Sequence, residues 1–195
     1  VNEEVVHGIP SNRKLLEGDI VSVDCGVEKN GYFGDHAYTF IVGEVDDEVK
    51  KLLQTTLNSL HFGIEQAIHG NKLGDIGHAI QSTCEQEGYG VVRDLVGHGL
   101  GKSLHEDPSV PNYGRKGKGT RLRSGMTLAI EPMINMGTWK VKTLSDGWTI
   151  VSADGSLSAH FEHDIVVREG EAEILSTFDY IAELSKNPEN VFYHG

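Results

Sequence analysis

Two histidines lie close together in LVGHGLGKSLHEDP, residues 95–108, a segment too rich in glycine to favour a helix. His98 stands between Gly97 and Gly99, and His105 follows seven positions after His98. Glycines leave room for close approach to a ligand because they carry no side chain. One imidazole in that setting suits metal coordination, and the second, beside the metal, suits donation to a substrate oxygen.

Four acidic residues stand in or beside apolar β-type segments, where an unpaired carboxylate is costly to bury. They are Asp24 in VSVDCGV, Asp35 after Gly34, Glu131 in LAIEPMI and Glu162 in AHFEHDIVV. Asp24 alone would be interpreted as a solvated strand residue. Neighbouring carboxylates raise each other's pKa, whereas a shared cation lets both stay ionised. Four acids with His98 therefore predict a pair of divalent ions of manganese, iron, cobalt or zinc rather than magnesium or calcium.

Length and composition narrow the class of protein. The 195 residues fit one domain, and the net charge of −12 disfavours binding to nucleic acid or to an anionic membrane. No apolar run approaches the roughly 20 residues that span a bilayer, and no signal-peptide pattern is present. Cys25 and Cys84 are too few and too far apart for a disulfide framework or a thiolate zinc site. We therefore expect a soluble, cytoplasmic protein.

The order of expected elements indicates an α+β chain. Residues 19–27 alternate, break at KNG and resume in YFGDHAYTFIVG, which predicts a β-hairpin. Helical periodicity predicts one helix that begins at Asp46 and Asp47 and continues to Gly70, and a second over about 74–87 that stops at Gly88. The remaining expected elements are a strand over 90–96, a basic loop over 114–125, strands in MTLAIEPMI, WTIVSAD and AHFEHDIVVRE, and a short helix with a polar tail over 178–195.

The glycines and acids also repeat at fixed offsets. Gly18 precedes Asp24 by six positions, as Gly125 precedes Glu131, and Gly43 follows Asp35 by eight, as Gly170 follows Glu162. These offsets predict two half-domains of similar build, each contributing a pair of carboxylates.

The five candidate ligands occur in the order Asp24, Asp35, His98, Glu131 and Glu162, and the words HGIP, GHGLGKSLHEDP, AIEPM and SLSAHFEHDIVV stand around them. With these words, the sequence closely resembles the type I methionine aminopeptidases from Val1 to about Ser176. The resemblance implies the pita-bread fold, in which two pseudo-symmetric halves, a curved antiparallel sheet covered by helices, surround a dimetal site. Residues 1–195 would form a single catalytic metallopeptidase domain, without the N-terminal extension of family members.

The resemblance also implies metal-site roles. Asp24 would chelate one divalent ion, His98 and Glu131 would bind the other, and Asp35 and Glu162 would bridge the two. A bridging water or hydroxide is the family's nucleophile, and Glu131 would accept its proton.

The resemblance assigns substrate contacts as well. His105 would stabilise the tetrahedral intermediate of the scissile amide, and His7 would contact the substrate across the site. Trp148 and His7 would border the methionine pocket, together with Leu104, which stands where the family often has an aromatic residue. His160 stands where glutamine is common, and both His160 and His163 are close enough in sequence to tune Glu162.

Further expectations concern partners and a second kind of ion. Asn2 and Ser158 match positions that help some members bind a structural monovalent cation. The implied substrates are nascent chains and peptides with N-terminal methionine and a small second residue, and the implied state is a monomer. The basic loop 114–125 is most simply a solvated turn, with contact to the ribosome as the alternative.

Other interpretations fit less well. Prolidase and aminopeptidase P share the ligand set, but they have a longer N-terminal domain and different words around the histidines. The interval between His105 and Glu131 is too short for the insertion of type II enzymes. A catalytically inactive pita-bread domain that binds peptides would generally have lost ligands, and this sequence retains all of them.

Overall fold

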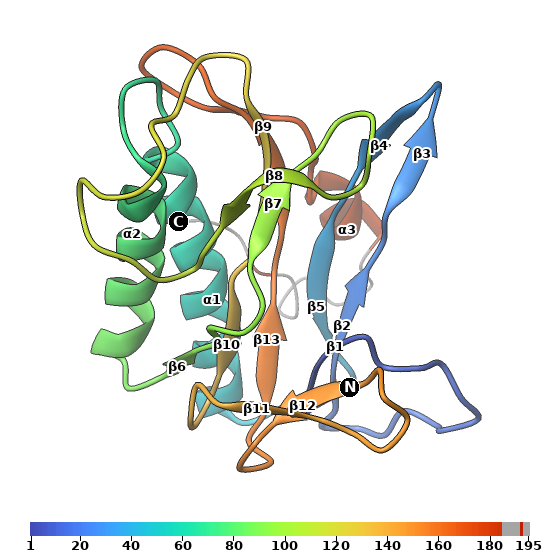
Figure 1. The fold of residues 1–195 in the computed structure, drawn as a ribbon. Coiled ribbons are helices and arrows are strands. Elements are labelled where there is room, and N and C mark those ends of the chain that lie inside the picture. The colour runs from blue at the N-terminus through green and yellow to red at the C-terminus, as the bar shows by residue number, and fades with distance from the viewer. Residues whose placement is uncertain (185–191, 193–195) are drawn as a thin grey trace.

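The computed structural model describes residues 1–184 and 192. Helices α1 (Asp47–Glu65) and α2 (Leu73–Gln86) lie side by side at one side of the strands, and the N-terminal strands lie at the other (Figure 1). Helix α1 contacts β9, β10 and β13, so the apolar faces of the helices close over the middle of the molecule. In the described part of the chain, no helix is long and apolar enough to cross a membrane.

The strands form several small sheets. Their bounds are β1 (Glu4–Val6), β2 (Ile20–Asp24), β3 (Val27–Lys29), β4 (Tyr32–Gly34), β5 (Ala37–Ile41), β6 (Gly90–Val91), β7 (Gly97–Gly99), β8 (Glu106–Val110), β9 (Thr127–Ile130), β10 (Met133–Asn135), β11 (Val141–Thr143), β12 (Ile150–Ser152), β13 (Ser158–His160), β14 (His163–Val166) and β15 (Glu173–Ile174). Over the described residues, the largest sheet has the order β15-β14-β9-β7-β8, and two three-stranded sheets have the orders β13-β10-β6 and β1-β12-β11. All the ladders between these strands are antiparallel.

The predicted N-terminal hairpin is confirmed. Strand β2 pairs with β5 from Ile20 opposite Ile41 to Asp24 opposite Ala37, and β3 pairs with β4 beyond it. Asn30 and Gly31 both have positive φ, 55° and 76°. Two such residues between paired strands are what a tight hairpin turn requires.

The repeated offsets correspond to equivalent backbone geometry. Gly18 and Gly125 have φ values of 94° and 92°. Their amides donate to the carbonyls of Val42 and Val167 at 2.8 and 2.9 Å. Gly43 and Gly170, one and three positions after those acceptors, also have positive φ. In both halves of the chain, a glycine with positive φ therefore begins the segment that leads through a strand to Asp24 or Glu131.

Some predicted element boundaries were wrong. Helix α1 ends at Glu65 rather than near Gly70, because Ile68 forms a bridge with Arg168. The strand predicted over 90–96 is limited to β6, because the chain leaves that sheet to carry residues 97–99 into the five-stranded one.

The other helix predictions agree with the structure. Helix α2 ends just before Gly88, which has a φ of 84°, and α3 (Asp179–Leu184) forms the short C-terminal helix. The predicted polar tail lies outside the described residues, except for Phe192, whose amide donates to the Tyr38 hydroxyl at 2.9 Å.

Two predicted strands are each broken in two, and the break falls at an acid. MTLAIEPMI divides into β9 and β10 at Glu131 and Pro132, since proline cannot donate a ladder hydrogen bond. AHFEHDIVVRE divides into β13 and β14 at Phe161 and Glu162. At the first break the chain passes from the five-stranded sheet (β9) to a three-stranded sheet (β10). At the second break it returns from that three-stranded sheet (β13) to the five-stranded one (β14). The acids therefore lie outside the regular ladders, where their side chains can turn toward a common point.

Substitution of a glycine beside His98 is expected to destabilise this arrangement. A Cβ on Gly97 would collide with the backbone carbonyl of Ala129 in β9, which pairs with β7. Overpacking of this kind typically costs about 1–3 kcal/mol, so Gly97→Ala should lower the free energy of unfolding in urea by that amount. Gly101→Ala is the matched control, because its Cβ would make only ordinary contacts with Glu106. Equal stability of the two variants would contradict the expectation.

Candidate functional site

A cavity of about 170 Å³ lies where the broken strands meet. Its polar lining residues are His7, Asp24, Asp35, His98, His105, Glu131 and Glu162, and its apolar lining residues are Val6, Leu95, Val96 and Met133. All five residues expected to bind metal and both histidines expected to contact substrate therefore line one cavity. The backbone amide of Glu162 donates to the carbonyl of Ala37 at 2.9 Å, which joins the two halves of the chain beside that cavity.

The orientation of His98 follows from a backbone hydrogen bond. Its Nδ1 lies 2.9 Å from the carbonyl oxygen of Gly99. Because a carbonyl can only accept, Nδ1 carries a proton, and in the neutral form of the ring Nε2 presents a lone pair. That Nε2 faces Glu131 Oε1 at 3.5 Å and Asp35 Oδ2 at 3.7 Å. A lone pair that faces two carboxylate oxygens is the arrangement expected of ligands around a cation.

The acids of the cavity are crowded and poorly solvated. Burial raises the pKa of Glu162 well above its usual value, and the carboxylates of Glu131, Asp35 and Asp24 raise it further. Its Oε1 is buried without a hydrogen-bond partner. Asp24 keeps solvent access, yet desolvation raises its pKa as well; His160 opposes that shift, and the neighbouring Asp35 and Glu131 add to it. These directions show that the carboxylates disfavour one another's ionised form in this cavity, which a bound cation would reverse.

The residues present fit a divalent metal. One ligand atom each from Asp35, His98 and Glu162 lie within 4.8 Å of one another, and all three residues are buried. The donor set of carboxylate oxygens and one imidazole nitrogen suits first-row transition ions. The unpartnered Glu162 Oε1 and the lone pair of His98 are the atoms that a cation would satisfy.

Two histidines line the cavity beside the acid cluster. The ring of His105 meets that of His98 edge-on, with centroids 4.3 Å apart. His7 is exposed and adopts a φ of 60°, an uncommon conformation for a residue with a side chain. Its ring stacks on that of Trp148 with centroids 5.0 Å apart.

Two residues expected in the methionine pocket do not line this cavity. The side chain of Trp148 is 59% exposed and reaches the site through its contact with His7. Leu104 packs toward Gly26, where an added Cβ would lie 3.3 Å from Leu104 Cδ1. The motifs around Trp148 and Leu104 predicted that both would border the pocket. Their side-chain directions depend on the segments they contact, which the motifs do not specify.

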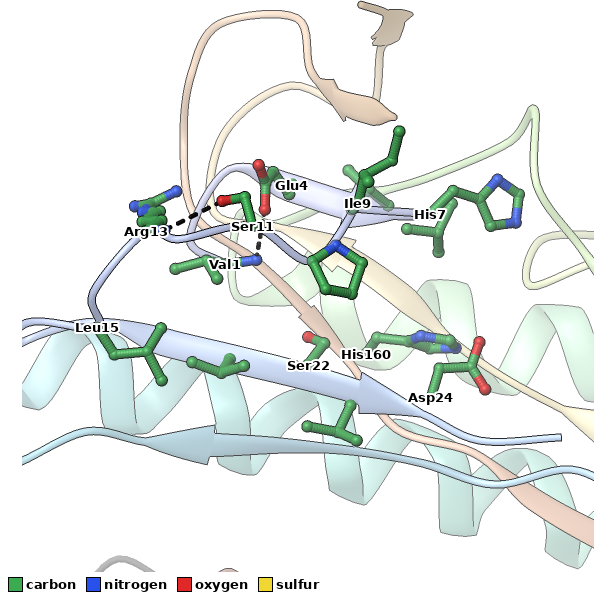
Figure 2. A pocket seen from close by; sticks show the side chains of 16 residues that line it. Val1, Glu4, His7, Ile9, Ser11, Arg13, Leu15, Ser22, Asp24 and His160 are labelled. Carbon is green, nitrogen blue, oxygen red and sulfur yellow. Dashed lines mark hydrogen bonds and ion pairs between the residues drawn. The ribbon is translucent and has the colours of Figure 1, made fainter. Parts of the chain in front are cut away.

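A larger cavity of about 510 Å³ adjoins the first. It lies between the segment 1–15 and the face of β2, as Figure 2 shows. Val6, His7 and Asp24 line both cavities and therefore form a wall that the two share. Val23 on β2 is 49% exposed because its side chain borders this opening rather than the core.

Asp164 is a site residue that sequence reasoning missed. Its Oδ2 accepts a hydrogen bond of 2.7 Å from the backbone amide of Asp35 and so fixes the start of that ligand's side chain. Burial raises the pKa of Asp164 to about 6. An acid within the apolar run HDIVV, two positions after Glu162, was the available signal.

Other expected contacts around the site differ from the sequence interpretation. His160 Nε2 lies 3.5 Å from Glu131 Oε2 without forming a hydrogen bond, whereas His163 Nδ1 lies 2.7 Å from the Ser176 hydroxyl, so the contacts described for these two rings are with residues other than Glu162. Asn2 binds Asp19 and the amide of Ile20 through its side chain.

Ser158 lies next to Asn2. Its amide donates to the carbonyl oxygen of Asn2 at 2.9 Å, and its Oγ is buried without a partner. A buried hydroxyl without a partner fits the expected monovalent cation, which stays a prediction.

Comparisons with known proteins agree with this geometry. The profile of metallopeptidase family M24 matches residues 1–169. The methionine aminopeptidase of Clostridium acetobutylicum is 56% identical over 177 residues, which cover 90% of this chain and 71% of the relative. The crystal structure of the Thermotoga maritima methionine aminopeptidase superposes with a TM-score of 0.87 at 54% identity, over 89% of this chain and 70% of that one.

A more distant structure discriminates between branches of the family. Prolidase from Thermococcus sibiricus superposes with a TM-score of 0.68 at 25% identity, over 88% of this chain and 41% of that one. The mixed helices and antiparallel sheets form the pita-bread fold that these proteins share. The match covers a larger share of the methionine aminopeptidase than of the prolidase, and the identity is higher. Both comparisons favour the methionine aminopeptidases over prolidase. The chain belongs to metallopeptidase family M24, and within that family to the methionine aminopeptidases.

Proposed function

We propose that this chain removes N-terminal methionine from peptides and nascent chains whose second residue is small. The observation that carries the proposal is the convergence of four carboxylates and His98 on one cavity that His7 and His105 also line. Asp24 would bind one divalent ion, His98 and Glu131 a second, and Asp35 and Glu162 both. Two ions held there would supply an activated water as the nucleophile.

The chain's own residues would perform the remaining tasks. Glu131 would accept the proton of the attacking water, because its carboxylate borders the cavity beside His98. His105 would donate to the oxygen of the scissile amide as charge develops there. His7 would contact the peptide from the opposite wall, where it is exposed and oriented by stacking on Trp148. The apolar wall around Leu95, Val96 and Met133 keeps water from the reacting atoms.

Release of free methionine from a Met-Ala-Ser peptide tests this function. The protein is freed of metal with a chelator, and manganese, cobalt, iron or zinc is then added separately. We expect no release without metal and turnover with at least one ion, because the nucleophile depends on the ion. A Met-Leu-Ser peptide should be cleaved much more slowly, since a bulky second residue would clash near the acids.

Two outcomes would contradict the proposal. Cleavage of an Xaa-Pro peptide in preference to Met-Ala-Ser would indicate a prolidase-type specificity, the alternative that the shared fold leaves open. Release of methionine at full rate in the presence of chelator would exclude the metal-dependent reaction.

We also propose a monomeric state and treat contact with the ribosome as an alternative for the basic loop 114–125. The cationic residues of that loop are exposed, and within the described part of the chain they form no ion pair: Arg115, Lys116, Lys118, Arg121 and Arg123. A solvated turn explains this exposure. Co-sedimentation with ribosomes at low and high salt, for the wild type and a variant with these cations neutralised, separates the two interpretations.

A further inference from the structure

His160 occupies a buried position in the wall of the larger cavity. It ends strand β13, the residue is 1% exposed, and it lines the larger cavity. Figure 2 shows its imidazole beside the carboxylate of Asp24, at the end of β2. A buried imidazole next to ligands from both halves of the chain calls for a polar role, because apolar residues would fill the position without desolvation cost.

The backbone of His160 is held rigidly by Thr39 on strand β5. The Thr39 hydroxyl donates to the carbonyl oxygen of His160 at 2.7 Å and accepts from its amide at 2.9 Å. The Ser22 hydroxyl lies 2.9 Å from the same Thr39 oxygen. These two bonds come from a side chain and not from strand pairing. The Thr39 hydroxyl therefore fixes the backbone position from which the imidazole extends.

The imidazole of His160 approaches Glu131 on the side away from His98. His160 Nε2 lies 3.5 Å from Glu131 Oε2, and His98 Nε2 lies 3.5 Å from Glu131 Oε1. The backbone carbonyl of Glu131 accepts a hydrogen bond of 3.0 Å from Asn112. The Glu131 carboxylate is thus placed between two rings, and His160 Nε2 is buried with no hydrogen-bond partner.

We propose that His160 is a positioning residue for Glu131. Its Nε2–H would donate to Glu131 Oε2, which lies 3.5 Å away, and would thereby hold Oε1 toward His98, where a divalent ion would bind. The inference rests on the proposed metal site, and it concerns the orientation of one ligand rather than the identity of the reaction. A neutral imidazole suffices for this donation, so the role requires no positive charge on His160.

Replacements that keep or remove the N–H donor test the proposal. His160→Gln keeps an N–H donor, whereas His160→Leu fills the space without one. The measurement is calorimetric titration of the metal-free protein with Mn²⁺ alone and with Co²⁺ alone. Residues that orient a ligand typically contribute about 10- to 100-fold to metal affinity, so His160→Leu should weaken binding by that factor. His160→Gln should restore most of the affinity.

A second variant addresses the same contact without altering the ring. Thr39→Val removes the hydroxyl clamp on the His160 backbone and should weaken metal binding in the same direction, by less than His160→Leu. The thermal unfolding midpoint of each metal-free variant separates loss of packing from loss of orientation. If His160→Leu does not fold, His160→Met takes its place, because an unbranched side chain adapts better to the cavity.

The outcomes distinguish this inference from the proposed function. Wild-type affinity in a folded His160→Leu or His160→Met protein would overturn the role of His160. Equal weakening by glutamine and leucine would also overturn it, because a donor would then make no difference. If the wild type binds metal but releases no methionine, the proposed function fails, while the metal titrations still decide the role of His160.

Discussion

Loss of metal binding and of methionine release is expected for two single-residue changes, His98→Ala and Glu162→Gln. His98 presents its Nε2 lone pair to Asp35 and Glu131, and Glu162 has a buried oxygen without a partner in the same cluster. Residues that only orient a metal ligand typically contribute about 10- to 100-fold to affinity, so loss of a ligand should exceed about 100-fold. Calorimetric titration with Mn²⁺ or Co²⁺ measures affinity, and methionine release measures activity.

The stability of the metal-free proteins makes this prediction sharper. Burial and the neighbouring carboxylates raise the pKa of Glu162, which means that its ionised form is disfavoured in the metal-free protein. Glu162→Gln removes the ionisable group, so the metal-free variant should unfold at a temperature no lower than the wild type. A ligand that binds only the folded state raises the midpoint, and this increase should be lost in the variant. His78→Ala, on the exposed face of α2, is the control for removal of an imidazole. Wild-type activity in either site variant would exclude that residue as a ligand.

Removal of the His105 side chain is expected to separate catalysis from metal binding. His105 lies beside His98 with ring centroids 4.3 Å apart, yet it does not belong to the cluster of close ligand atoms formed by Asp35, His98 and Glu162. If His105 donates to the developing oxyanion, His105→Ala should lower kcat by about 100- to 1,000-fold, as loss of such a donor does elsewhere. Metal affinity should stay at the wild-type value, and KM should change less than kcat.

Two measurements test the assignment of His105. His105→Gln retains an N–H donor and should recover part of the lost turnover. Loss of metal in His105→Ala would show that this residue acts as a ligand rather than as a donor to substrate. An unchanged kcat would remove His105 from the reaction altogether.

The sequence predicted much of the secondary structure because the signals are local. The KNG turn and the alternation on either side of it specify the β2–β5 hairpin through residues adjacent in the chain. Helix α2 begins and ends within one residue of its predicted bounds, since Gly88 stops it through a left-handed φ. The predicted end of a helix or strand was wrong where a distant segment pairs with the backbone. Ile68, for example, forms a bridge with Arg168 instead of extending α1.

The sequence by itself determined which groups are available for chemistry: four acids in apolar surroundings, an imidazole between glycines, and equal glycine offsets in the two halves. These follow from residue type and short spacing, which are properties of the chain before it folds. Their convergence was decided by tertiary structure, because the contacts join segments more than a hundred positions apart, as between Glu162 and Ala37.

Tertiary packing also decided features that no local pattern contains. Both C-terminal acids lie where a predicted continuous strand passes between two sheets, and that break turns each carboxylate toward the cavity. His160 faces Glu131 rather than its sequence neighbour Glu162 because Thr39 fixes its backbone from another strand. Local periodicity specifies which face of one strand a side chain occupies, whereas the partner it meets depends on how several strands pack together.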